Sequence, residues 1–181
     1  MFEMEGNFQK QTYRNRTYVY GANGKLMFNV PVRHDKAVKH QKYKEIKVAN
    51  ETPWQRLHWK SLESAYRTSP YFEYYEDELR PLFEKRYEFL MDLNLDTIHL
   101  INECLQLDIE TSKTTTYQPI VTDIHDCRKL AVVKKEPDYG FESYTQVFDD
   151  KHGFIPNLSI LDLLFNEGTN ALTYLEKQAI S

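Results

Sequence analysis

The sequence has only two cysteines and no long hydrophobic run, and each shortage excludes a class of protein. Cys104 and Cys127 stand in unrelated surroundings without a Cys-x-x-Cys motif, so neither a disulfide framework nor a zinc knuckle is expected. No stretch approaches the roughly 18 apolar residues that a membrane-spanning helix needs. The residues after Met1 lack the basic and apolar stretches of a secretory signal. We therefore expect a cytoplasmic protein that is neither exported nor inserted in a membrane.

Basic residues are scarce beyond the first third of the chain. Lys and Arg number 12 against 5 Asp and Glu in residues 1–60, but 11 against 22 in residues 61–181. The formal charge of the whole chain is -4, whereas a nucleic-acid-binding domain is usually basic overall. The pattern disfavours nucleic acid as a partner and favours a local anion-binding surface in the first third.

Aromatic residues, in contrast, are abundant. The chain has 13 Tyr, 10 Phe and 2 Trp, and 41% of its residues are hydrophobic. A chain of 181 residues with this composition can close a core rich in rings, so disorder of the whole chain is excluded. There is no internal repeat and no low-complexity tract, and the length predicts one domain.

Residues 12–32 have the pattern of a β-hairpin. Two runs of β-forming residues, 12–20 and 26–32, flank Asn23-Gly24, a strong signal for a two-residue turn. With these two as the turn residues, Val19 would face Phe28 on the core side of the hairpin. The opposite side would carry Arg14, Arg16, Tyr18 and Tyr20, and Lys10 would be in phase if the first strand extends backward.

Helical patterns follow the hairpin. After a basic loop over 33–42 and a third strand over 43–48, Thr52 and Pro53 predict a helix start, and the helix should end near Ser69-Pro70. A longer helical pattern spans about 77–105, with a kink or a new cap expected at 92–94.

The rest of the chain is less regular until its C-terminal part. Residues 107–145 are poorly periodic, and only 114–119 and 129–133 are candidates for short strands. Asn157 is expected to cap a C-terminal helix that Gly168 stops, and Thr169 to cap a short final helix.

We therefore predict an α/β or α+β fold in a single domain spanning residues 1–181. An N-terminal β-hairpin and further strands would pack against a long helix pair and C-terminal helices. The predicted parts are the hairpin and strand (7–48), a helical part (52–106), an irregular part (107–145) and the C-terminal helices (146–178).

The hairpin arginines are the first candidate site. Arg14 and Arg16 on one strand face, with Lys10 near, form an array of donors that suits a phosphate or a carboxylate, because guanidinium groups bind such anions bidentately. The alternative is a solvated strand face whose cations pair with acidic residues from the rest of the chain.

His58 is the second candidate. It falls near the centre of the apolar arc of the helix after Pro53, where an imidazole must be hydrogen-bonded and could carry a proton. The alternative is a core histidine with its hydrogen bonds satisfied. Trp59, off the centre of that arc, would close a pocket or simply pack.

Asp162 lies on the flank of an apolar helix face. Its carboxylate could orient a histidine or meet an arginine, either in a site or as part of the core. Asp123, His125 and Asp126 are also residue types that bind metals, but their spacing matches no metal pattern, so no metal site is expected. No cofactor is evident from the sequence.

Three stretches make the chain similar to a known family. They are Asn-Phe-Gln-Lys-Gln-Thr-Tyr-Arg-Asn-Arg (7–16) with the Ala-Asn-Gly turn (22–24) and Val-Pro-Val (30–32), residues 58–66 through 69–75, and residues 146–148 with 153–166. In these motifs the chain resembles the WbqC-like family, bacterial proteins associated with O-antigen and other surface-polysaccharide gene clusters. Family members usually have a further strand and helix before the first motif. Their absence here would leave a sheet edge unpaired and predicts a homodimer or poor solubility.

The resemblance implies a cytoplasmic transferase in the biosynthesis of surface glycans, forming an acyl or amide bond on a nucleotide-linked amino sugar. His58 and Asp162 would be the catalytic residues. The ligand, a nucleotide sugar or another anionic small molecule, would be bound by Gln9, Lys10, Tyr13, Arg14, Asn15, Arg16, Trp59, Tyr66 and Asn157. The alternative is a non-catalytic binding or scaffold protein, whose tyrosine-rich hairpin face docks a glycan, a nucleotide sugar or a partner enzyme.

Overall fold

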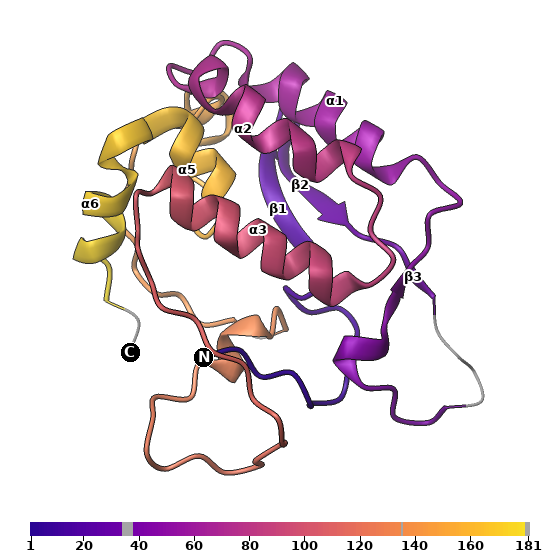
Figure 1. The fold of residues 1–181 in the computed structure, drawn as a ribbon. Coiled ribbons are helices and arrows are strands. Elements are labelled where there is room, and N and C mark those ends of the chain that lie inside the picture. The colour runs from indigo at the N-terminus through magenta and orange to yellow at the C-terminus, as the bar shows by residue number, and fades with distance from the viewer. Residues whose placement is uncertain (34–37, 135, 180–181) are drawn as a thin grey trace.

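The strands lie in the N-terminal part of the chain (Figure 1). In the computed structural model, which describes residues 1–33, 38–134 and 136–179, β1 (Arg16–Gly21) pairs antiparallel with β2 (Gly24–Asn29). A second antiparallel pair joins β3 (Val32–Arg33) to β4 (Lys47–Val48). Together with the helices that follow, these strands make a single α+β domain, one of the two fold classes that the sequence predicts.

The hairpin forms where predicted, but the predicted turn is wrong. Gly21 pairs with Gly24, so the two residues of the turn are Ala22 and Asn23. A turn on Asn23 and Gly24 would need a positive φ at both, and only Gly24 has one, at +93°. Val19 therefore faces Leu26 instead of Phe28. The register shifts by two residues, so the residues paired within β1 and β2 keep their predicted alternation between the two faces.

Two helices replace the single long one that was expected. They are α2 (Phe72–Glu84) and α3 (Leu90–Cys104), and the chain breaks at 85–89 rather than at 92–94. The cause is a long-range pairing: the amide of Val48 donates to the carbonyl of Glu88, and the amide of Leu90 donates to the carbonyl of Ile46. This pairing with the β4 region satisfies backbone groups that a continuous helix would bond internally.

The other boundaries also differ in detail. Only Lys47–Val48 of the predicted third strand is a strand, preceded by the 3-10 helix η1 (Tyr43–Glu45). Helix α1 (Trp54–Tyr66) starts one residue after Pro53, which is its cap residue. The basic loop predicted over 33–42 lies partly outside the described residues, at 34–37.

The C-terminal part contains α4 (Asp149–His152), α5 (Ile160–Glu167) and α6 (Ala171–Lys177). The cap of α5 is Ser159, whose hydroxyl accepts from the amide of Leu161, and not Asn157 as predicted. Gly168 ends α5 with a φ of +55°, as expected. It also begins η3 (Gly168–Asn170), so Asn170 rather than Thr169 precedes α6.

The segment between α3 and α4 is irregular, as predicted, and the strands proposed at 114–119 and 129–133 do not form. The 3-10 helix η2 (Arg128–Ala131) occupies part of the second of these ranges. Within the described ranges, no helix has both the length and the apolar character needed to cross a membrane.

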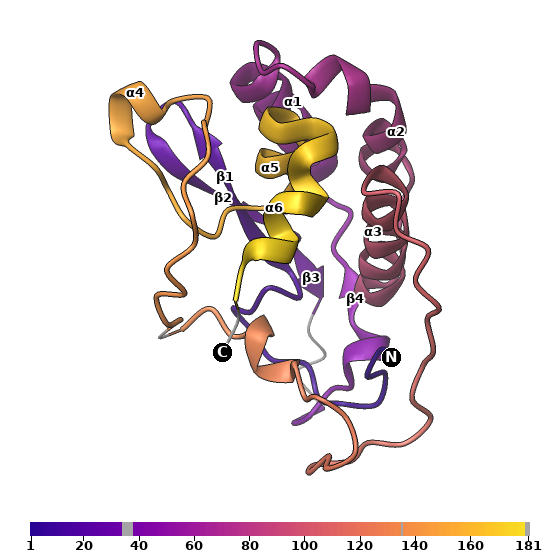
Figure 2. The same cartoon turned by 90° about the vertical axis from the view of Figure 1, so that its left-hand side faces the viewer.

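Helices α1 and α5 form the middle of the molecule. Both contact β1 on one side and α2 on the other, and α3 packs against α2 (Figure 2). Aromatic rings fill this centre: the ring centroid of Phe165 lies 5.1 Å from that of Tyr66 and 5.0 Å from that of Phe72. A smaller core around Ile46, Trp54 and Leu90 joins β4 to α1 and α3.

A buried polar network crosses the main core. The Tyr66 hydroxyl accepts from the backbone amide of Tyr20 (2.7 Å) and donates to Oδ1 of Asp162 (2.7 Å). Tyr144 Oη (2.6 Å) and Gln146 Nε2 (2.9 Å) donate to Oδ2. Burial raises the pKa of the Asp162 carboxyl, and these hydrogen bonds oppose the rise. The network links β1, α1, α5 and the 144–146 segment.

We expect Tyr66→Phe to lower the free energy of unfolding by about 1–3 kcal/mol, because it leaves a buried amide and a buried carboxylate oxygen without a partner. Urea denaturation followed by circular dichroism measures this loss. Tyr74→Phe is the matched control, since the Tyr74 side chain is 61% exposed on α2. Equal stability of the two variants would contradict the assigned role of the hydroxyl.

Candidate functional site

A pocket of about 450 Å³ opens beside the hairpin. Its walls come from residues 13–17, from Phe28 and Val30, from α1, α2 and α3, from the described residues of the 130–141 segment, which exclude residue 135, and from 157–161 at the start of α5. The volume falls within the range of roughly 300–1,000 Å³ that is usual for small-molecule sites.

Arg14 and Arg16 line this pocket. Neither guanidinium group forms an ion pair with a described residue, and Arg14 Nη1 and Arg16 Nε are buried without a hydrogen-bond partner there. Asn94 Nδ2 donates to the carbonyl oxygen of Arg14 (2.7 Å), and the Arg14 guanidinium lies 5.7 Å from the ring centroid of Tyr43. A buried cationic donor without a partner is costly, so the site suits an incoming anion.

His58 reaches the pocket from α1. Its ring stacks on Phe28 at 4.3 Å with an interplanar angle of 4°, and it meets the edge of Trp54 at 5.4 Å. Desolvation by burial lowers the pKa of the imidazole to about 4, so the ring is neutral at neutral pH. No described residue forms a hydrogen bond with its ring nitrogens, which leaves a proton acceptor at the pocket wall.

The 130–141 segment supplies a carboxylate. Glu136 accepts from the Tyr13 hydroxyl at Oε2 (2.9 Å) and from Asn157 Nδ2 at Oε1 (2.6 Å). Burial raises the pKa of Tyr13, and the hydrogen bond to Glu136 raises it further. The phenol therefore stays protonated. Asn157 has a φ of +51°, a conformation that asparagine tolerates better than most residues.

Backbone bonds attach residues 131–132 to the stretch just before Arg14. The amide of Tyr13 donates to the carbonyl of Ala131 (2.8 Å), and Thr12 forms an isolated β-bridge with Val132. Two parts of the pocket wall, the one near Tyr13 and the one near Leu130, are therefore joined by backbone bonds.

The structure brings six of the predicted site residues to the pocket wall. They are Tyr13, Arg14, Asn15, Arg16, His58 and Asn157. Gln9 and Lys10 are exposed and lie outside the lining. Lys10 does not share a strand face with the arginines, because β1 begins only at Arg16 and Gln11 has a φ of +60°. Arg14 also precedes β1, so the prediction that Arg14 and Arg16 lie on one strand face is wrong, although both line the pocket.

Trp59, Tyr66 and Asp162 lie in the core instead of the pocket lining. Trp59 packs on Phe83, with its ring centroid at 5.2 Å. Asp162 makes neither the expected contact with a histidine nor one with an arginine, since its carboxylate accepts from two tyrosines and a glutamine. Tyr20 is also fully buried, so the hairpin face is less open than its pattern indicates.

Sequence reasoning did not identify the residues of the 130–141 wall. Glu136, Tyr139 and Phe141 all line the pocket, but they fall in a segment without periodicity. The only signal was local, an acidic residue close to two aromatic residues that flank Gly140. Among the described residues, no three His, Cys, Asp or Glu side chains gather as metal ligands would.

Comparison with known proteins gives the family. The chain belongs to the WbqC-like protein family, whose sequence model matches residues 2–138 and 133–174. An uncharacterised protein of Mycobacterium tuberculosis, Rv1507c, is 29% identical over 196 residues, which cover 93% of this chain and 83% of that protein. No solved structure matches the chain significantly.

The low pKa of His58 predicts a pH dependence of stability. The pKa of a histidine in the unfolded chain is near 6.5. Between about pH 6.5 and about pH 4, His58 is therefore protonated in the unfolded chain but neutral in the folded protein. We expect the free energy of unfolding to fall as the pH is lowered through this window, and His58→Phe to remove part of that fall. Denaturant titrations at several pH values test this.

The same substitution at the exposed His125 in the 107–145 segment is the control for this prediction. It should leave the slope of stability against pH as in the wild type. An unchanged slope in His58→Phe would show that His58 is not the residue concerned.

Proposed function

We propose that the pocket binds a nucleotide sugar or a related anionic small molecule, and that the protein transfers an acyl or amide-forming group on that ligand in surface-polysaccharide biosynthesis in the cytoplasm. The observation that carries the proposal is the pair of buried guanidinium nitrogens, on Arg14 and Arg16, that find no partner in the described structure. A diphosphate would satisfy both, because its oxygens accept bidentate hydrogen bonds from such groups.

The aromatic part of the pocket wall suits the base and the sugar of a nucleotide sugar. Phe28, Trp54 and Tyr139 line the pocket with rings against which a base or a sugar can pack. The association of the WbqC-like family with surface-polysaccharide gene clusters supports the choice of a sugar nucleotide over other anions.

His58 supplies the chemistry in this proposal. A hydroxyl or amine of the nucleotide sugar would attack the thioester carbonyl of an acyl donor such as acetyl-coenzyme A, and His58 would take the proton that the nucleophile loses. The C–S bond would then break, and the departing thiolate would accept that proton from His58. A bound phosphate close to the imidazole would raise the pKa of His58 from about 4 toward the range in which a base works best.

A second function, binding without turnover, is favoured by one observation. No described carboxylate contacts the His58 ring, and Asp162, the candidate for that role, is engaged with Tyr66 and Tyr144. An imidazole without an orienting partner is a weaker general base. The protein would then hold a nucleotide sugar or dock a partner enzyme.

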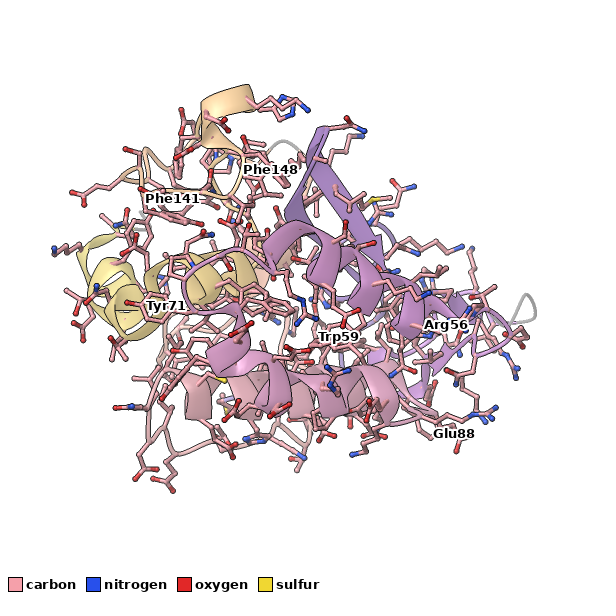
Figure 3. The ribbon with its side chains drawn as sticks, turned by 90° about the horizontal axis from the view of Figure 1, so that it is seen from above. Arg56, Trp59, Tyr71, Glu88, Phe141 and Phe148 are labelled. Carbon is pink, nitrogen blue, oxygen red and sulfur yellow. The ribbon has the colours of Figure 1, made fainter. Side chains whose placement is uncertain are left out.

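Substitution of Arg14 and Arg16 tests whether the pocket binds a nucleotide sugar. We expect Arg14→Ala and Arg16→Ala each to weaken the affinity for UDP-N-acetylglucosamine by about tenfold or more, since each removes charge-assisted hydrogen bonds. Isothermal titration calorimetry measures the affinity. Arg56→Ala is the matched control: Arg56 is exposed on α1, and Figure 3 shows it well apart from Phe141 of the pocket wall.

Two controls sharpen this prediction. Lys10→Ala should bind like the wild type, because Lys10 lies outside the pocket lining. If neither this nucleotide sugar nor inorganic pyrophosphate binds the wild type, or if the pocket variants bind as well as Arg56→Ala, the proposed site is wrong.

His58→Asn separates an enzyme from a binding module. The wild type is incubated with UDP-sugars and an activated acyl donor such as acetyl-coenzyme A, and products are followed by mass spectrometry. Loss of product with retained affinity in His58→Asn supports His58 as the base. Tight binding by the wild type with no product from any pair supports the binding module.

A further inference from the structure

The pocket contains charges of both signs that do not neutralise each other. Arg14 and Arg16 form no ion pair with any described residue, and the same holds for Glu136 across the described chain, although all three line one cavity. Side chains with opposite charges in one small pocket would ordinarily pair, and unpaired charges cost free energy when they are partly buried. A ligand that carries both charges would satisfy both ends.

Glu136 is held in place but not neutralised. Its two hydrogen-bond donors are the Tyr13 hydroxyl and the Asn157 amide, both of which are uncharged. Each carboxylate oxygen has a further lone pair that can accept a hydrogen bond. The donors therefore fix the orientation of the carboxylate and leave its negative charge for a ligand.

Aromatic rings accompany this carboxylate. Tyr13, Tyr139 and Phe141 line the same pocket, and the rings of Tyr139 and Phe141 stack at 5.3 Å with an interplanar angle of 24°. Ring faces attract cations, most strongly where water is excluded. A carboxylate and aromatic rings in the lining of one cavity suit an ammonium group, which is attracted to both, better than a neutral hydroxyl.

We propose that Glu136, with Tyr13, Asn157, Tyr139 and Phe141, forms a subsite for a ligand ammonium group, and that the ligand is a zwitterion whose phosphate faces Arg14 and Arg16. An amino-sugar phosphate has this chemistry. A neutral sugar can also donate to Glu136, but it leaves the carboxylate charge unbalanced. This inference rests on the proposed anion site. It adds that the ligand carries an ammonium group as well as its phosphate.

Two small probes that differ in one group test the subsite. Glucosamine 1-phosphate and glucose 1-phosphate share the phosphate, and only the first carries an amine. By calorimetry we expect the wild type to bind glucosamine 1-phosphate about tenfold more tightly, and Glu136→Gln to bind the two equally while keeping its affinity for glucose 1-phosphate. Glu142→Gln, a matched change outside the pocket lining, should keep the wild-type preference.

Tyr139→Leu provides a second variant that leaves the carboxylate in place. It removes a ring face but no charge, so the preference for the amine should fall by less than in Glu136→Gln. Thermal melting of each variant shows that it is folded before its affinities are compared.

The outcomes separate this inference from the function proposed above. Equal binding of the two probes by the wild type, with loss of both in Arg14→Ala, overturns the ammonium subsite and leaves the anion site standing. Absence of binding for both probes overturns the anion site and the subsite that rests on it. Persistence of the preference in Glu136→Gln shows that another group recognises the amine.

Discussion

The Tyr66 hydroxyl holds together the parts of the structure from which the pocket is built. It bonds the backbone of β1 on one side and the carboxylate at the start of α5 on the other, and both oxygens of that carboxylate are occupied. The amide of Ser159 also donates to the carbonyl of Tyr18 (2.6 Å). The hairpin, α1 and α5 are thus joined by buried hydrogen bonds. Unlike apolar packing, these bonds are directional, so they constrain the orientation of the three elements relative to one another.

Asp162 has a structural role in this core, although its residue type is also one that serves in catalysis. The sequence placed a carboxylate on the flank of an apolar face, a position compatible with catalysis or with structure. The structure surrounds it with three neutral donors and no cation among the described residues. A buried carboxylate satisfied in this way helps to specify the packing of α5 against α1.

Features set by near neighbours could be predicted from the sequence. The hairpin, the helix after Pro53 and the stop at Gly168 follow from local periodicity or turn residues. Features set by distant partners could not. The break between α2 and α3 depends on backbone pairing with residues 46–48, and no pattern within the helices reports it.

The same distinction explains the incomplete prediction of the site. Lys10 was placed in phase with the arginines by assuming a continuous strand, which the left-handed conformation of Gln11 interrupts. Glu136 could not be found, because its place in the pocket depends on Tyr13 and Asn157, which are respectively 123 and 21 residues away along the chain.

The attachment of the 130–141 segment to residues 12–13 has a consequence for selectivity. Because the Glu136 carboxylate accepts from the Tyr13 hydroxyl and from Asn157 Nδ2, and Tyr13 directly precedes Arg14, these hydrogen bonds limit the separation between the carboxylate and the Arg14 guanidinium. For the proposed zwitterion, the distance between its phosphate and its ammonium group would have to match this separation.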